Sequence, residues 1–240
     1  MKRICILLLP LLLFVQKGIS QEILTEFSAS DIKSARIHRP EWNLSYPIIE
    51  LNSGETLVLH FDQITERVGT FYYTFIHCDK DWNPSDIFTT DFLEGFAENQ
   101  VEEYEMSFNT TSNYIHYKVA FPNNNIRFQY SGNYIIKVYP MGEPENPVLI
   151  KRFMVSEKSV LIKPEPQRSK LTIGYDTHQQ VDFTVDHPGF NIIDPNRSVF
   201  ATILQNGRWD NARVNLKPDF IRTGQIAFND ISGKCNFPGG

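Results

Sequence analysis

Short runs in which apolar side chains occupy every second position constrain the fold of this chain more than any other feature. In residues 55–62, Leu57, Leu59 and Phe61 hold alternate positions, which is the period of a half-buried strand. Runs of similar length and character, many of them rich in aromatic and β-branched residues, recur at 46–51, 70–78, 103–108, 114–121, 132–139 and 148–155. No run of about 12 or more residues has the period of an amphipathic helix. The sequence therefore predicts an all-β protein.

The spacing of these runs predicts two domains in tandem. About seven strands at this spacing before residue 156 are typical of an immunoglobulin-like or fibronectin-III-like β-sandwich. The polar residues 156–158 and the stretch 164–169, which lacks apolar residues, mark a boundary. We therefore expect an N-terminal β-sandwich domain at 21–156 and a second one at 157–240. Only about 80 residues belong to the second, so we expect that sandwich to be incomplete.

A hairpin is predicted within the second domain. Asn206 and Gly207 separate two strand-like runs, and both residues tolerate the positive φ of a type I′ turn. We expect the runs on either side of this dipeptide to pair.

The first 20 residues have the features of a secretory signal peptide. Two basic residues precede the apolar run 4–15, and the small residues Gly18 and Ser20 lie three and one positions before a cleavage point at Gln21. The alternative is a membrane anchor, but twelve helical residues span only ~18 Å of a hydrocarbon core of ~30 Å. We expect residues 1–20 to direct export and to be removed.

The charge of the chain argues against one class of protein, and its cysteines leave two arrangements open. The chain has 23 basic and 28 acidic side chains, and losing Lys2, Arg3 and Lys17 with the signal peptide changes the formal charge from −5 to −8. An acidic surface argues against nucleic-acid binding, which requires cations to displace counterions from phosphates. Of the three cysteines, Cys78 and Cys235 remain after export. An oxidising compartment permits a disulfide between them, and two buried thiols in separate domains are the alternative.

The most polar segment of the chain, residues 77–86, contains a weak calcium candidate. Asp79, Asp81 and Asn83 alternate like the first oxygen ligands of a calcium loop. An EF-hand loop needs Gly at its sixth position and Glu at its twelfth, where this chain has Pro84 and Thr90. The favoured alternative is a turn in which Asp and Asn side chains bind local backbone amides.

No pattern of catalytic residues stands out. The histidines are spread singly along the chain, at His38, His60, His77, His116, His178 and His187. The chain has neither a Gly-x-Ser-x-Gly elbow nor a His-Glu-x-x-His motif. We predict a protein that acts by binding, not an enzyme, and one that needs no cofactor.

Several segments resemble the type IX secretion system plug protein family. The most specific is Phe71-Tyr72-Tyr73-Thr74-Phe75-Ile76-His77-Cys78-Asp79-Lys80-Asp81-Trp82-Asn83-Pro84-Ser85-Asp86. A second match to the family, Trp42-Asn43-Leu44-Ser45-Tyr46-Pro47-Ile48-Ile49-Glu50-Leu51, precedes it. Further matches are Ser107-Phe108-Asn109-Thr110-Thr111, Ser131-Gly132-Asn133-Tyr134, Arg152-Phe153-Met154-Val155, Thr177-His178-Gln179-Gln180-Val181-Asp182-Phe183, Leu204-Gln205-Asn206-Gly207-Arg208-Trp209-Asp210 and Phe237-Pro238-Gly239-Gly240.

The resemblance implies a periplasmic, non-enzymatic protein that is associated with the outer membrane through a partner. That partner is the outer-membrane translocon barrel of the type IX system, whose periplasmic opening the plug occludes. A different interpretation is a carbohydrate-binding or accessory module of an exported glycan-processing enzyme, which predicts exposed, coplanar tryptophans. A calcium-stabilised adhesin-like module is a third.

Overall fold

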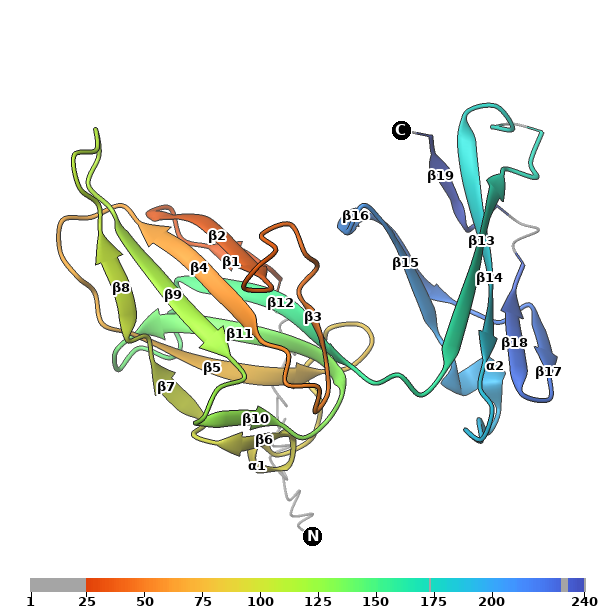
Figure 1. Cartoon of the computed structure of the whole chain (residues 1–240), viewed down its shortest axis with the longest axis horizontal. Helices are drawn as coiled ribbons and strands as arrows, with labels where there is room; N and C mark the ends of the chain where they lie inside the picture. The colour runs from red at the N-terminus through yellow and green to blue at the C-terminus, as the bar shows by residue number, and fades with distance from the viewer. Residues whose placement is uncertain (1–24, 173, 230–232, 240) are drawn as a thin grey trace, which may run out of the picture.

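The computed structural model describes residues 25–172, 174–229 and 233–239, and these residues are almost entirely β-strand (Figure 1). The predicted signal peptide at 1–20 lies outside them. The helices in the described ranges are two single turns, α1 (Thr89–Phe92) and α2 (Pro195–Ser198). Neither has the length and apolar character that crossing a bilayer requires. The prediction of an all-β fold is confirmed.

Strands β1 to β12 form a first unit built from two layers (Figure 1). One layer, sheet A, has the order β1 (Phe27–Ser28), β12 (Leu149–Ser156), β11 (Gly132–Pro140), β5 (Phe71–Cys78) and β7 (Glu98–Gln100), with β3 (Ile48–Glu50) parallel to β12. The other, sheet B, has the order β2 (Ile32–His38), β4 (Leu57–Gln63), β9 (Ile115–Phe121) and β8 (Glu103–Met106). A small ribbon pairs β6 (Leu93–Gly95) with β10 (Ile126–Phe128).

The core of the first unit lies between sheets A and B and is dominated by aromatic rings. The alternating residues Leu57, Leu59 and Phe61 of β4 are fully buried there, as their spacing predicts. Across the core Phe121 of β9 and Phe153 of β12 contact edge to face, with centroids 4.9 Å apart. Each fully buried side chain of this size stabilises the fold by about 1.5–3 kcal/mol. The outward face of sheet A carries a smaller apolar cluster, which the candidate functional site uses.

Strand β2 is absent from the sequence-based expectations, and its backbone explains why. Ser34 has a φ of 54°, and the pairing of β2 with β4 shifts register between Lys33 and Arg36. A bulge of this kind places two residues opposite one and breaks the period of two. The buried apolar positions of β2, Ile32 and Ile37, are therefore not an even number of residues apart, and His38 beside them is buried as well.

Strands β13 to β19 form a second unit. Its main sheet has the order β13 (Leu161–Arg168), β14 (His178–Asp186), β18 (Gln225–Phe228) and β17 (Phe220–Arg222), and β19 (Asn236–Pro238) also pairs with β14. The hairpin β15 (Ala201–Gln205) and β16 (Arg208–Leu216) turns at Asn206 and Gly207, whose φ values are 54° and 72°. The predicted hairpin is confirmed.

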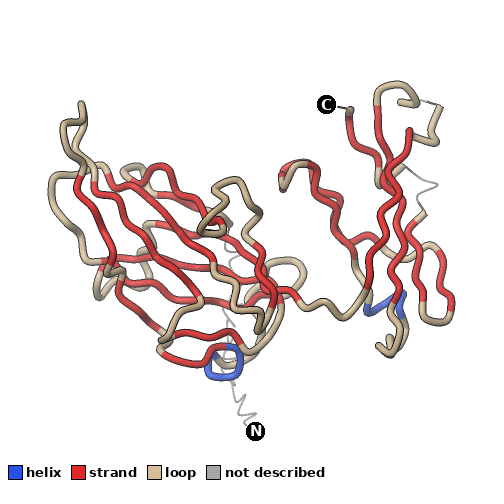
Figure 2. The backbone as a smooth tube through the Cα atoms, in the orientation of Figure 1, coloured by secondary structure: helices blue, strands red, loops and turns tan. Residues whose placement is uncertain are grey.

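The stretch 164–169, interpreted above as one mark of the domain boundary, is largely strand β13. Pro164 and Pro166 lie in this strand, opposite Phe183 and Val181 of β14. Prolines are tolerated because β13 lies at an edge of its sheet, where the missing N–H groups face no neighbouring strand among the described residues. The connection that leaves the first sheets is thus the short segment between β12 and β13 (Figure 2). We propose that the two domains meet there, next to Ser156.

Candidate functional site at the junction of the two units

The segment 77–86 begins at the end of β5 and folds into a tight loop closed by its own side chains. Oδ1 of Asp79 accepts the backbone N–H groups of Asp81 at 2.8 Å and of Asn83 at 2.9 Å. The backbone N–H of Asp79 donates to the carbonyl of Asn83 at 2.8 Å, and Trp82 takes a φ of 67°. This is the turn held by an Asp side chain that the polar spacing favours. Its effect is to display Lys80, Asp81 and Trp82 side by side.

His77 fastens the base of the loop. Its Nε2 lies 3.2 Å from the carbonyl of Ser131 and its Nδ1 lies 2.8 Å from the hydroxyl of Ser85. A carbonyl can only accept, so Nε2 carries the proton and, in the neutral ring, Nδ1 accepts from Ser85. The backbone at position 132 passes very close to the His77 ring, because a Cβ on Gly132 would lie 2.4 Å from Nε2 of His77. Glycine at position 132 therefore leaves room for the ring of His77 and its two hydrogen bonds.

Trp82 lies on the outward face of sheet A and contacts the second unit. Its side chain is only 5% exposed and belongs to the apolar cluster with Cys78, Ile135 and Ile150. The guanidinium of Arg152 lies 4.7 Å from the Trp82 ring centroid, a cation–π contact. On its other side Trp82 meets Trp209 of β16, with centroids 5.3 Å apart and planes at 85°.

The two residues before Trp82 make polar contacts with the same unit. Nδ2 of Asn215 donates to Oδ1 of Asp81 at 2.7 Å, and Nζ of Lys80 donates to Oδ1 of Asn215 at 3.0 Å. The hydrogen bond from Asn215, and then that from Lys80, lower the pKa of the Asp81 carboxyl. Lys80 also lies 4.4 Å from the ring centroid of Phe200. Three consecutive residues of one loop thus join the two units.

A cavity of about 280 Å³ lies beside these contacts. Tyr46 and Trp82 line it from the first unit, and Leu204, Gly207 and Trp209 line it from the second. The turn of the β15–β16 hairpin packs closely against Tyr46, because a Cβ on Gly207 would lie 2.2 Å from Cε1 of Tyr46. The cavity is walled chiefly by aromatic and aliphatic groups, so the junction is a packed contact, not a catalytic cleft.

Comparison with known proteins assigns the first unit. Residues 32–157 match the family model described as the type 9 secretion system plug protein 1st domain. The chain belongs to the type IX secretion system plug protein family. A solved structure of a hypothetical protein from Parabacteroides merdae ATCC 43184 is similar, with a TM-score of 0.85 and 28% sequence identity over 91% of this chain. This chain spans 55% of the length of that protein. No curated protein matches this chain.

The match confirms the resemblance found in segment 77–86, which lies inside it. Trp209 and Asn215, the partners of this segment in the second unit, lie beyond the matched residues. The family is not a family of enzymes, and the junction offers no arrangement of nucleophile and base.

The calcium candidates have other partners in the structure. Oδ1 of Asp79 binds backbone amides, Asn83 donates its side-chain amide to Asp79, and Asp81 binds Asn215. Among the described residues, no group of three or more His, Cys, Asp or Glu side chains is placed to hold a metal ion. A calcium site at Asp79, Asp81 and Asn83 therefore stays a prediction without support from the geometry.

Cys78 and Cys235 are not joined by a disulfide, so the alternative of two buried thiols is the one that the structure has. Cys78 lies in the cluster around Trp82, whereas Cys235 lies in the core of the second unit. Burial raises the pKa of the Cys78 thiol to about 11, which keeps it protonated.

The remaining residues of the motif have structural places. Pro84 forms a bridge pair with Cys78, and Asp86 is exposed to solvent. Sequence reasoning missed Asn215, which lies in no recognisable motif and meets the loop only through the tertiary fold. It also missed that His38, His60 and His116, which are spread singly along the chain, stack their rings.

Proposed function

We propose that this protein binds the periplasmic opening of the outer-membrane translocon barrel of the type IX secretion system and occludes it. The observation that carries the proposal is the family match over residues 32–157, which includes the whole loop 77–86. In this proposal residues 1–20 direct export, and the mature protein works in the periplasm without catalysis or a cofactor. Association with the outer membrane comes through the barrel.

The junction suits such a role physically. A stopper must resist deformation, and a protein that is already rigid has less conformational freedom to lose on binding. The loop 77–86 fixes the two units through an aromatic pair and two side-chain hydrogen bonds to Asn215. The acidic charge of the chain argues against the phosphate backbone of nucleic acids as a partner.

The carbohydrate-binding alternative has no structural support. It requires exposed, coplanar tryptophans, but Trp82 is buried and its plane is nearly perpendicular to that of Trp209. Trp42 is exposed, but its ring has no stacked aromatic partner among the described residues.

Two experiments test the proposal: co-purification of the protein with its barrel, and measurement of the ion conductance of the isolated barrel. The full-length protein, tagged in its source bacterium, should co-purify with a large outer-membrane barrel that mass spectrometry identifies. Barrels isolated from a deletion strain should conduct ions in planar bilayers, and added protein should close them. A barrel from the deletion strain that stays closed would refute occlusion, and loss of the barrel from the purified complex would refute binding.

A variant links this test to the junction. Trp82→Ala with Trp209→Ala removes the aromatic contact, so we expect weaker closure, whereas Trp42→Ala, which changes an exposed tryptophan, is the matched control.

A further inference from the structure

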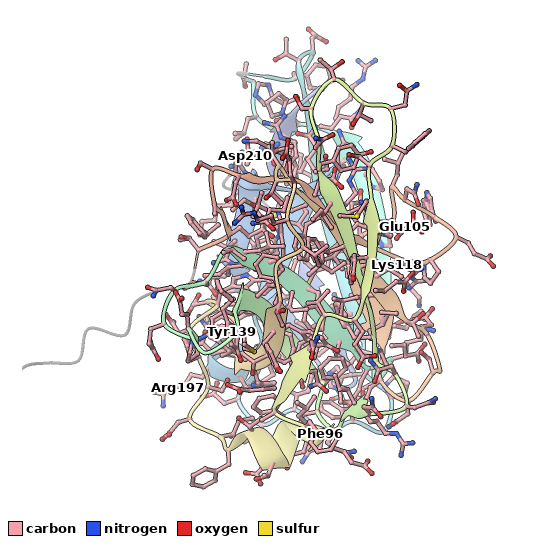
Figure 3. The ribbon with its side chains drawn as sticks, turned by 90° about the vertical axis from the view of Figure 1, so that its left-hand side faces the viewer. Phe96, Glu105, Lys118, Tyr139, Arg197 and Asp210 are labelled. Carbon is pink, nitrogen blue, oxygen red and sulfur yellow. The ribbon has the colours of Figure 1, made fainter. Side chains whose placement is uncertain are left out.

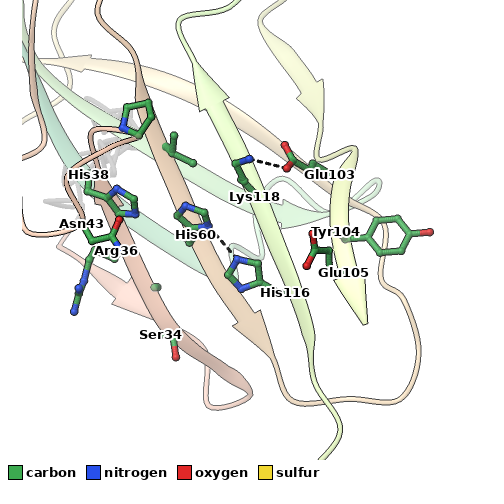
Figure 4. A pocket seen from close by; sticks show the side chains of 13 residues that line it. Ser34, Arg36, His38, Asn43, His60, Glu103, Tyr104, Glu105, His116 and Lys118 are labelled. Atoms are coloured by element: carbon green, nitrogen blue, oxygen red, sulfur yellow. Dashed lines mark hydrogen bonds and ion pairs between the residues drawn. The ribbon is translucent and has the colours of Figure 1, made fainter. Parts of the chain in front are cut away.

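Three histidines from three neighbouring strands stack on the outward face of sheet B. His38 ends β2, His60 lies in β4 and His116 lies in β9 (Figure 4). The rings of His38 and His60 are 4.9 Å apart with planes at 11°, and those of His60 and His116 are 5.1 Å apart at 27°. We call these three residues the histidine face. It lies in the first unit and is independent of the loop 77–86.

The hydrogen bonds of the histidine face fix where its protons lie. Nδ1 of His38 lies 2.7 Å from the carbonyl of Arg39, and Nδ1 of His116 lies 2.6 Å from Oδ1 of Asp62. Both oxygens can only accept, provided that Asp62 is ionised, so both Nδ1 atoms carry protons. Nε2 of neutral His116 is then an acceptor, and Nδ1 of His60 donates to it at 3.0 Å (Figure 4).

In this neutral arrangement all three rings carry their proton on Nδ1. The hydrogen bonds between described residues do not engage Nε2 of His38 or of His60. An added proton therefore goes to one of these two atoms and turns an acceptor into a charged donor. Burial, then the charges of His116, His38 and Lys118, lower the pKa of His60, which favours its neutral form.

The histidine face borders a hollow of about 980 Å³, and apart from the histidines its charged lining residues carry no net charge. Ionised Asp62, which binds His116, adds one negative charge beside it. Arg36 and Lys118 supply two positive charges, and Glu103 and Glu105 of β8 supply two negative ones (Figure 3 shows Lys118 and Glu105). Nζ of Lys118 is 2.7 Å from Oε1 of Glu103, whereas Arg36 makes no ion pair among the described residues. Each proton taken up by the histidines therefore makes the hollow more positive, although the whole chain is acidic.

We propose that this hollow binds a carboxylate-rich segment of a protein partner when the histidines are protonated and releases it when they are neutral. Arg36 and the Nε2 atoms of His38 and His60 would supply the donors, and the proton taken up stays on the imidazole that meets the carboxylate.

Carboxylates are suitable ligands for the cationic side chains of this surface, because two carboxylates of the chain itself already bind such side chains here. Asp62 binds His116 and Glu103 binds Lys118, each at hydrogen-bonding distance. Pro40 and Tyr104 also line the hollow and add non-polar contact area, which suits a polypeptide better than a small inorganic anion. Bidentate pairing with a guanidinium such as that of Arg36 favours carboxylates and phosphates, so the experiment must separate these two.

The probe is a blocked hexaglutamate peptide, titrated calorimetrically into the purified full chain. We expect Kd to be at least ~10-fold lower at about pH 5.5 than at about pH 7.5. His60→Gln should abolish most of this difference, and His178→Gln, on β14 in the second unit, should not change it. Equal Kd values at the two pH values would overturn the proposal, as would wild-type behaviour of His60→Gln.

Two further measurements keep the result decisive. Arg36→Gln leaves the histidine face intact and should weaken peptide binding roughly 3- to 10-fold at the lower pH. Unchanged binding by this variant would overturn the site even if His60→Gln failed to fold. Inorganic phosphate should compete only at much higher concentration than the peptide, and competition at equal anion concentration would assign the hollow to phosphate groups and refute a protein partner.

Discussion

Removing the Trp82–Trp209 contact should reveal a measurable coupling between the two units. Trp82 is 95% buried, and truncating a buried Trp to Ala costs about 3–5 kcal/mol of the free energy of unfolding. Trp209 is 36% exposed, so its truncation should cost less, about 1–2 kcal/mol. An edge-to-face pair with centroids 5.3 Å apart contributes about 0.5–1.5 kcal/mol beyond buried area. Each single variant loses this amount, so the double variant should cost less than the sum by about 1 kcal/mol.

The assay is urea unfolding followed by far-UV circular dichroism, because each variant also removes a fluorophore. Trp42 is 61% exposed, so Trp42→Ala should change the free energy of unfolding by no more than about 0.5 kcal/mol. Additivity of Trp82→Ala and Trp209→Ala within about 0.3 kcal/mol would show that the two rings do not interact in solution. That result would also remove the structural argument for a rigid stopper.

Three other perturbations test separate features. Asp79→Ala removes the acceptor of two backbone amides and should destabilise the first unit by about 1–2 kcal/mol in thermal or urea unfolding, and a neutral effect would contradict the loop geometry. The pKa of His60 is lowered by burial and by His116, so between that pKa and 6.5 the unfolded chain binds a proton that the folded chain does not. The free energy of unfolding should therefore fall as pH drops below about 6.5, and His60→Gln should flatten this dependence in urea titrations at several pH values. Because burial raises its pKa to about 11, the Cys78 thiol should resist alkylation in the native protein and react once urea unfolds the chain, which mass spectrometry can follow; rapid native labelling would contradict its burial.

The local sequence pattern was sufficient to predict strands and turns wherever apolar and polar side chains alternate regularly. Leu57, Leu59 and Phe61 are buried as their spacing predicts, and the turn at Asn206 and Gly207 has the positive φ values that its composition indicates. The same reasoning failed where the local rule has an exception. The bulge in β2 breaks the period of two. The prolines of β13 hide a strand, because an edge strand tolerates them.

The candidate site was only half predictable. The loop 77–86 was recognisable because its turn chemistry is local, and its Asp79 cap follows from residues two and four positions away. Its partners Trp209 and Asn215 lie well over 100 residues further along the chain. No periodicity or motif relates positions so far apart.

The sequence by itself determined the all-β class, the regularly alternating strands, the family and the turn chemistry of the loop 77–86. Only the tertiary structure decided which residues face each other across strands and units. His38, His60 and His116 appear isolated along the chain, but antiparallel pairing brings β2, β4 and β9 side by side and stacks their rings. Cys78 and Cys235 could have paired by count alone, but packing placed them in different cores. The physical reason is the same in both cases: strand register and packing, not distance along the chain, set which side chains meet.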